Sequence, residues 1–244
     1  MAVALGGSQD DGGEPSRLST TPCNIASVQD RYNIARTIVS EITPLKTLDD
    51  TASPQNKALE WIVCEDKISS RLIDDRDSST DILPPQARGT RSGGDAGEAQ
   101  VLRRYILAAV YFATSPWDES WNFLSTDVHE CGWHEEKKRQ NFPYDEVDPA
   151  GFVCLKLQDP DVIWWDGAEI VHNDTDMEID VMDWNFRIPN NLTGTIPPEF
   201  GHLTDLAILS LDNQKGLRGS LPSTVGNMKN LYSVSILFAG PNFG

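Results

Sequence analysis

The last quarter of the chain contains an internal repeat of 25 residues, and this repeat restricts the possible folds more than any other feature. The stretch VMDWNFRIPNNLTGTIPPEFGHLTD, which starts at Val181, aligns without a gap with LAILSLDNQKGLRGSLPSTVGNMKN, which starts at Leu206. A third, partial copy starts at Leu231. Because one copy has too small an apolar face to fold alone, the copies must stack side by side. The sequence therefore predicts a solenoid.

Each copy carries large apolar residues at every second position near its start, which is typical of a strand with alternate side chains inward. We therefore expect the strands of successive copies to stack in parallel. Glycine at equivalent positions favours a backbone conformation closed to other residues, and proline at equivalent positions stiffens the return segments. The residues concerned are Trp184, Phe186, Leu209, Leu211, Val234 and Ile236 for the strands, Gly194 and Gly219, and Pro197 and Pro222.

The segments LTGTIPPEFGHLTDL and LRGSLPSTVGNMKNL resemble the plant-type leucine-rich repeat, whose core pattern is LxGxIPxxLGxLxxL. The resemblance implies an α/β leucine-rich-repeat solenoid over residues 181–244, with two full copies and one partial copy. Residues 98–180 resemble the amino-terminal cap of such proteins. The segments SPQNKALEWIVCED and LRRYILAAVYFATSPW are similar to the front of leucine-rich-repeat proteins of diatoms and related algae.

The chain has four cysteines, and the resemblance implies a disulfide for two of them. Cys131 and Cys154 correspond to the cysteine pair of the cap, although the insertion HEEKKRQNFPYDEVDPAG separates them. Such a disulfide would imply export to an oxidising compartment. Cys64 lies on the apolar side of a predicted helix, which favours a buried free thiol. The pairing of Cys23 stays open.

The remainder of the chain divides by composition. Residues 1–22 are rich in Gly, Ser and Asp, which predicts a disordered tail. Residues 23–68 have the apolar periodicity of amphipathic helices, one of which begins at Ser53 and Pro54. Residues 69–97 are rich in Asp, Ser, Pro and Gly, which predicts a flexible linker. A further helix, with an apolar stripe from Val101 to Phe112, opens the cap region.

The net charge of −17 excludes a sequence-independent grip on nucleic acid or anionic lipid, which needs clustered Lys and Arg. Acidic residues concentrate between Asp145 and Asp183, where Lys156 is the single Lys or Arg. This region is either a solvated face or a surface for a cationic partner. No apolar run is long enough to predict a membrane span. The sequence lacks a secretory signal at its start, which conflicts with the export that the cap cysteines imply.

No catalytic motif is present, so we predict neither enzymatic activity nor a cofactor. In HECGWHE the second histidine is too far from the first for a zincin, although a looser zinc site at His129, Cys131 and His134 is an alternative. The run NDTDMEID lacks the glycine of a calcium loop, and its alternation is more typical of a strand. Asn173 and Asn191 head sequons and would carry glycans if the chain is exported.

The predicted function is recognition through the concave face of the solenoid by a non-catalytic part of a receptor-like or secreted protein. Nine residues would form three rows on that face: Asp183, Ile208 and Ser233; Asn185, Ser210 and Ser235; and Arg187, Asp212 and Leu237. The partner would be a protein, peptide or glycan, at the cell surface or outside the cell. The alternative is an intracellular structural or adaptor protein in the cytoplasm. We also expect a longer parent protein, with more repeats, a membrane segment or a kinase-like portion.

Overall fold

The computed structural model of the chain describes residues 23–78, 93–114, 123–130, 133–138, 147–155, 181–185, 192–211, 214–231, 233–236 and 243. The predicted disordered tail lies outside these residues. The helices of the amino-terminal part are η1 (Ile25–Val28), α1 (Gln29–Val39), α2 (Leu45–Leu48), α3 (Pro54–Cys64), α4 (Lys67–Ser78) and α5 (Gly93–Ala113). We call α1 to α5 the helical layer.

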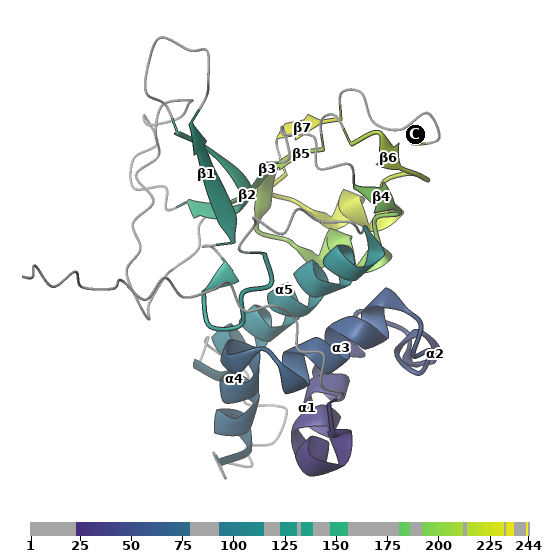
Figure 1. Cartoon of the computed structure of the whole chain (residues 1–244), viewed down its shortest axis with the longest axis vertical. Helices are drawn as coiled ribbons and strands as arrows, with labels where there is room; N and C mark the ends of the chain where they lie inside the picture. Colours follow the sequence, from purple (N-terminus) through teal and green to yellow (C-terminus); the bar gives the residue numbers. More distant parts are fainter. Residues whose placement is uncertain are drawn as a thin grey trace, which may run out of the picture.

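The second half of the chain forms strands and short 3₁₀ helices. In chain order these are β1 (His134–Lys138), β2 (Val147–Leu155), β3 (Val181–Asn185), β4 (Thr193–Gly194), η4 (Pro198–His202), β5 (Leu206–Ser210), β6 (Gly216–Leu217), η5 (Ser223–Asn227) and β7 (Ser233–Ser235). Figure 1 shows α5 running between the other helices and the green and yellow repeat segment.

The start of α3 follows the sequence prediction. Ser53 is the N-cap residue, Pro54 occupies the first helical position, and the Ser53 hydroxyl accepts a hydrogen bond of 3.0 Å from the backbone N–H of Asn56. One face of the helix then enters the core, where Leu59 and Ile62 are fully buried. Because α3 packs along α5, the apolar stripes of both helices share one core.

The prediction of a flexible linker over residues 69–97 is wrong at both ends. The helix α4 extends from Lys67 to Ser78, and α5 already begins at Gly93. Asp66 caps α4 by accepting a hydrogen bond of 3.1 Å from the Ser69 N–H. Ile73 anchors the helix in the core, whereas Arg71, Asp74 and Asp75 are exposed on the solvent side. Residues 79–92 lie outside the described part of the chain.

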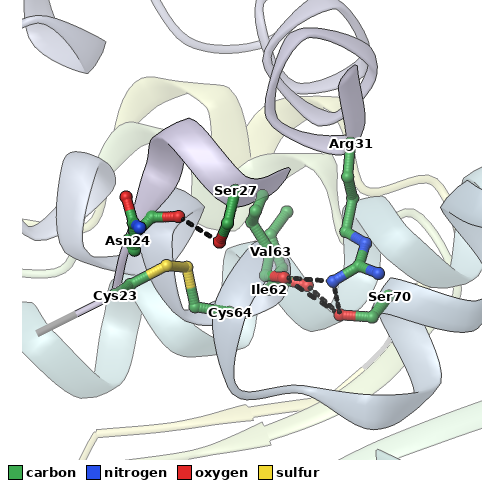
Figure 2. Close-up of a disulfide and its surroundings, with 8 residues drawn as sticks. All are labelled: Cys23, Asn24, Ser27, Arg31, Ile62, Val63, Cys64 and Ser70. Atoms are coloured by element: carbon green, nitrogen blue, oxygen red, sulfur yellow. Dashed lines mark hydrogen bonds between the residues drawn. A yellow bond between two sulfur atoms is a disulfide. The ribbon is translucent and has the colours of Figure 1, made fainter. Parts of the chain in front are cut away.

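The prediction of a free thiol at Cys64 is also wrong, because Cys64 forms a disulfide with Cys23. Figure 2 shows that the bond joins the end of α3 to the segment that leads into η1. Beside it, Arg31 of α1 donates a hydrogen bond of 3.0 Å to the carbonyl of Val63 and pairs with Asp74 of α4. The packing of α1 against α3 and α4 thus brings together two cysteines that are 41 residues apart in the sequence.

The main sheet has five strands in the order β1-β2-β3-β5-β7. The pairs β1–β2 and β2–β3 are antiparallel, whereas β3–β5 and β5–β7 are parallel. The predicted parallel stacking of the three copies is therefore confirmed for these strands. Trp184 lies opposite Leu209, and Leu209 opposite Val234, so the spatial register follows the 25-residue period of the sequence.

The two equivalent glycines both have positive φ, 81° for Gly194 and 78° for Gly219, as their positions in the repeat predicted. Gly194 belongs to β4, which pairs in parallel with β6, and it also lies against the end of α5. A Cβ built on Gly194 would overlap the carbonyl oxygen of Ala113, whereas a Cβ on Gly219 would meet only a methyl group at 3.4 Å. Gly194 therefore allows α5 to approach the repeats closely.

We predict a graded response to alanine at three glycines of the repeats. Gly226→Ala should change the free energy of unfolding by about 0.5 kcal/mol or less, because its Cβ would meet nothing within 4 Å. Gly219→Ala should cost about 1 to 2 kcal/mol for its positive φ. Gly194→Ala should cost clearly more, because the overlap with Ala113 is added. Urea unfolding of the three variants measures this order, and equal losses at Gly194 and Gly219 would contradict the close approach of α5.

Candidate functional site

Two of the three predicted rows lie side by side on adjacent strands. Asp183 of β3 lies opposite Ile208 of β5, which in turn lies opposite Ser233 of β7. Two residues further along, Asn185, Ser210 and Ser235 form the second row in the same manner. Adjacent strands are about 4.8 Å apart, so each row places its residues at regular short intervals.

The row between these two belongs to the opposite face of the sheet, because successive strand residues alternate between faces. It consists of Phe152, Trp184, Leu209 and Val234. Leu209 is fully buried, which identifies this side as the core side at β5, whereas Val234 on the edge strand β7 is 49% exposed. We call the other side, with the rows of Asp183 and Asn185, the open face.

The hairpin β1–β2 extends the open face beyond the repeats. Gly151 of β2 lies opposite Asn185, and His134 of β1 lies opposite Gly151. The row of Asn185 and Ser210 therefore continues over all five strands, from His134 at one edge to Ser235 at the other. Sequence reasoning missed this extension, because the hairpin has no counterpart in the repeat.

Several predicted residues lie outside the described part of the chain. They are the third row, Arg187, Asp212 and Leu237, together with Cys131 and the sequon residues Asn173 and Asn191. Cys154 lies in β2, opposite Met182 of β3. The run NDTDMEID is also outside, so its prediction as a strand stays a prediction.

Trp133 precedes β1 directly and anchors this strand in the helical layer. Its ring is fully buried, edge-on to Trp61 of α3 with 5.9 Å between ring centroids. Its indole N–H donates a hydrogen bond of 3.2 Å to the carbonyl of Ser125. The guanidinium carbon of Arg104 lies 4.4 Å from the centroid of the Trp133 ring, which is close enough for a cation–π interaction.

Arg104 of α5 is fully buried, and all five of its N–H groups have acceptors. Nε and Nη2 donate to the two carboxylate oxygens of Asp66 at 2.7 and 2.6 Å. Nη1 donates to Glu130 at 3.1 Å and to the carbonyl of Val128 at 3.0 Å, and Nη2 donates to the carbonyl of Ser125 at 3.1 Å. The side chain thus ties α5 to the start of α4 and to the segment that leads into β1.

Glu130 is the second buried carboxylate of this cluster. Besides Arg104, it accepts hydrogen bonds from Arg103 at 2.7 Å and from Gln100 at 3.1 Å. Burial alone raises the pKa of Glu130, but the charges of His129, Arg104 and Arg103 outweigh burial and lower it to about 2. Burial and the two arginines lower the pKa of His129, although Glu130 opposes this.

The described residues contain no group of three His, Cys, Asp or Glu side chains that could hold a metal ion. The looser zinc site would include Cys131, which lies outside them. Among the helices described, none is both long and apolar enough to cross a membrane.

No protein-family model matches the chain, and searches of curated proteins and of solved structures likewise find no match.

We predict that Arg104→Met lowers the free energy of unfolding by about 3 to 5 kcal/mol, because Asp66 would stay buried without a cation and Glu130 would keep only Arg103. The matched control is Arg36→Met, which removes an ion pair with Asp49, whose side chain is 64% exposed, and should cost about 1 kcal/mol or less. Urea unfolding measures both values. A loss at Arg104 as small as that at Arg36 would contradict its central role.

The pKa shifts predict that the free energy of unfolding decreases in two steps as the pH is lowered. The pKa of His129 is below its ordinary value of 6.5, so below this pH the unfolded chain takes up a proton that the folded chain resists. The pKa of Glu130 is lowered from 4.5 to about 2, so its contribution is present above pH 4.5 and is lost as the pH falls toward 2.

Urea midpoints between pH 8 and pH 3 measure these steps. We expect His129→Gln to flatten the upper step and Glu130→Gln to flatten the lower one. A wild-type midpoint that rises on acidification, or variants that keep both steps unchanged, would show that these residues do not control the pH dependence.

Proposed function

We propose that this chain is a non-catalytic recognition module, built on a short leucine-rich-repeat solenoid, that binds a protein, peptide or glycan partner on the open face of its sheet. The observation that carries the proposal is the alignment of Asn185, Ser210 and Ser235 on neighbouring strands. The same period that defines the sequence repeat thus sets the spacing of the residues offered to a partner.

The repeat geometry supports the solenoid. Parallel strands recur at the period of the sequence, the equivalent Gly194 and Gly219 share a positive φ, and Pro197 and Pro222 each precede a 3₁₀ helix. Asn230 also donates a hydrogen bond of 3.0 Å to the carbonyl of Thr204, which joins the ends of successive copies. Copies related in this way can share one core, as stacked repeats require.

The chemistry of the open face favours a polar partner. The row from His134 to Ser235 consists of His, Gly, Asn, Ser and Ser, and it contains no Asp, Glu, Lys or Arg. Hydroxyl, amide and imidazole groups both donate and accept hydrogen bonds, as glycan hydroxyls and peptide groups do. The adjacent row of the same face carries Asp183, so the uncharged row is the expected centre of an interface, where charged residues are depleted.

The disulfide favours an extracellular or cell-surface location. Disulfides persist in oxidising compartments and are rare in the cytosol, so the Cys23–Cys64 bond supports export. The predicted pair of Cys131 and Cys154 and the sequons at Asn173 and Asn191 are consistent with it. An intracellular adaptor is the alternative, and it requires both cysteine pairs to be reduced.

The location is tested by expression through a eukaryotic secretory route and peptide mapping with and without thiol alkylation. We expect a peptide that links Cys23 to Cys64, a second that links Cys131 to Cys154, and glycan at Asn173 or Asn191. Four alkylated thiols and bare asparagines would contradict export and favour the intracellular alternative.

Binding is tested by probing immobilised collections of glycans and peptides with the full chain. We expect the bound probes to be lost with Ser210→Arg. A large charged side chain would then replace a small hydroxyl-bearing one on β5, the central strand of the repeats. Lys57→Glu on the exposed side of α3 is the control and should bind as the wild type does. Binding that survives Ser210→Arg but fails with Lys57→Glu would place the recognition surface on the helices instead.

A further inference from the structure

The first copy of the repeat buries a carboxylate against the helical layer. Glu199 lies in η4, and only 1% of its surface is exposed. Its Oε1 accepts a hydrogen bond of 2.9 Å from the Thr43 hydroxyl, and its Oε2 accepts one of 2.9 Å from the Gln55 side-chain amide. Thr43 lies between α1 and α2, and Gln55 lies in the first turn of α3. Two separate parts of the helical layer therefore converge on one residue of the repeat.

Tyr105 of α5 extends the same network. Its hydroxyl oxygen lies 2.9 Å from Oγ1 of Thr43. Because the single proton of the Thr43 hydroxyl is donated to Glu199, the Tyr105 hydroxyl is the donor to Thr43. Burial raises the pKa of Tyr105, and the charge of Glu199 raises it further against the opposing effect of Thr43, so Tyr105 keeps its proton. Three helical segments are thus linked to one carboxylate.

All these donors are neutral. Within the described ranges, Glu199 forms no ion pair with a Lys or Arg side chain. A carboxylate buried without a cation is costly unless its oxygens accept hydrogen bonds. A displaced helical layer that still covered Glu199 would bury it without Thr43 and Gln55. The network therefore penalises wrong docking positions more than it adds affinity to the right one.

The second copy differs at the equivalent position. Thr224, 25 residues after Glu199, is half-buried and donates a hydrogen bond of 2.7 Å to the carbonyl of Pro198, within the repeats. The apolar neighbours of the two positions differ in burial as well. Phe200 is 1% exposed beneath the helices, whereas its equivalent Val225 is only partly buried. The helices cover the first copy, and the sequence of the copies differs where the helices touch.

We propose that Glu199 selects the position at which the helical layer docks, so that residues 23–114 act as a built-in partner of the first repeat. The 3₁₀ side of that copy is an interaction surface occupied by the chain's own helices. The helical layer and the repeats are therefore one cooperative unit. This inference is independent of the proposed recognition function, since it concerns the opposite side of the repeats.

The first test compares Thr43→Ser with Thr43→Val in the full chain by urea unfolding. Valine has the shape of threonine without its hydroxyl, whereas serine keeps the hydroxyl and loses a methyl group. If the network fixes the docking, Thr43→Val lowers the midpoint more than Thr43→Ser. In a Glu199→Leu background, Thr43→Val should have a much smaller effect than in the wild type. A larger loss for serine, or equal effects of Thr43→Val in both backgrounds, would overturn the proposal.

The second test moves the carboxylate instead of deleting it from the chain. The exchange Glu199→Thr with Thr224→Glu keeps the composition but moves the carboxylate to the second copy, and Thr224→Glu alone is the control. Amide hydrogen exchange of α3 and α5 should be faster in the exchanged variant than in the control. Equal protection in the two variants would show that the position of the carboxylate does not select the docking site.

Discussion

The guanidinium of Arg104 is the group on which the described structure depends most. It lies fully buried between the carboxylates of Asp66 and Glu130, against the ring of Trp133. A charge in such a place is tolerated only because all its donors have acceptors and two anions balance it. These partners belong to the start of α4 and to the segment before β1. One side chain of α5 therefore fixes both the helical layer and the strand that begins the open face.

Among the described residues, the repeats meet the helical layer on the side of η4, and the rows of Asp183 and Asn185 lie on the sheet. On the inner side, Gly194 admits the end of α5 and Glu199 accepts hydrogen bonds from Thr43 and Gln55. On the sheet, the rows of Asp183 and Asn185 run on into the hairpin β1–β2. We regard this division as the basis of the proposed function, because a rigid support on one side preorganises residues on the other.

The sequence was sufficient to predict the features that repeat or that follow local rules. The 25-residue period gave the register of Asn185, Ser210 and Ser235, since stacked copies must pair equivalent residues. The dipeptide Ser53-Pro54 marked the start of α3, because its capping acts within one turn. Both predictions depend only on residues near each other or on strict periodicity.

Features that depend on distant partners were not predictable in the same way. The bond between Cys23 and Cys64 requires α1 to pack on α3, and no spacing rule encodes that packing. The composition of α4 predicts a linker because Asp and Ser are common in both, and the anchoring role of Ile73 is visible only once the core exists. Arg104 and Glu199 gave no signal, since a buried charge is recognised by its partners.

The central claim is that the copies stack in the register of the sequence repeat and so form the rows of the open face. Its most direct test is disulfide formation in the variant Ser210→Cys with Ser235→Cys, compared with Ser210→Cys and Val234→Cys, each mapped by peptide mass. The first pair lies in register on one face, at a strand spacing of about 4.8 Å that a disulfide can bridge, whereas the second pair lies on opposite faces. The account predicts an intramolecular bond in the first variant only. A bond in the second variant alone, or in neither, would contradict the stacking of the repeats.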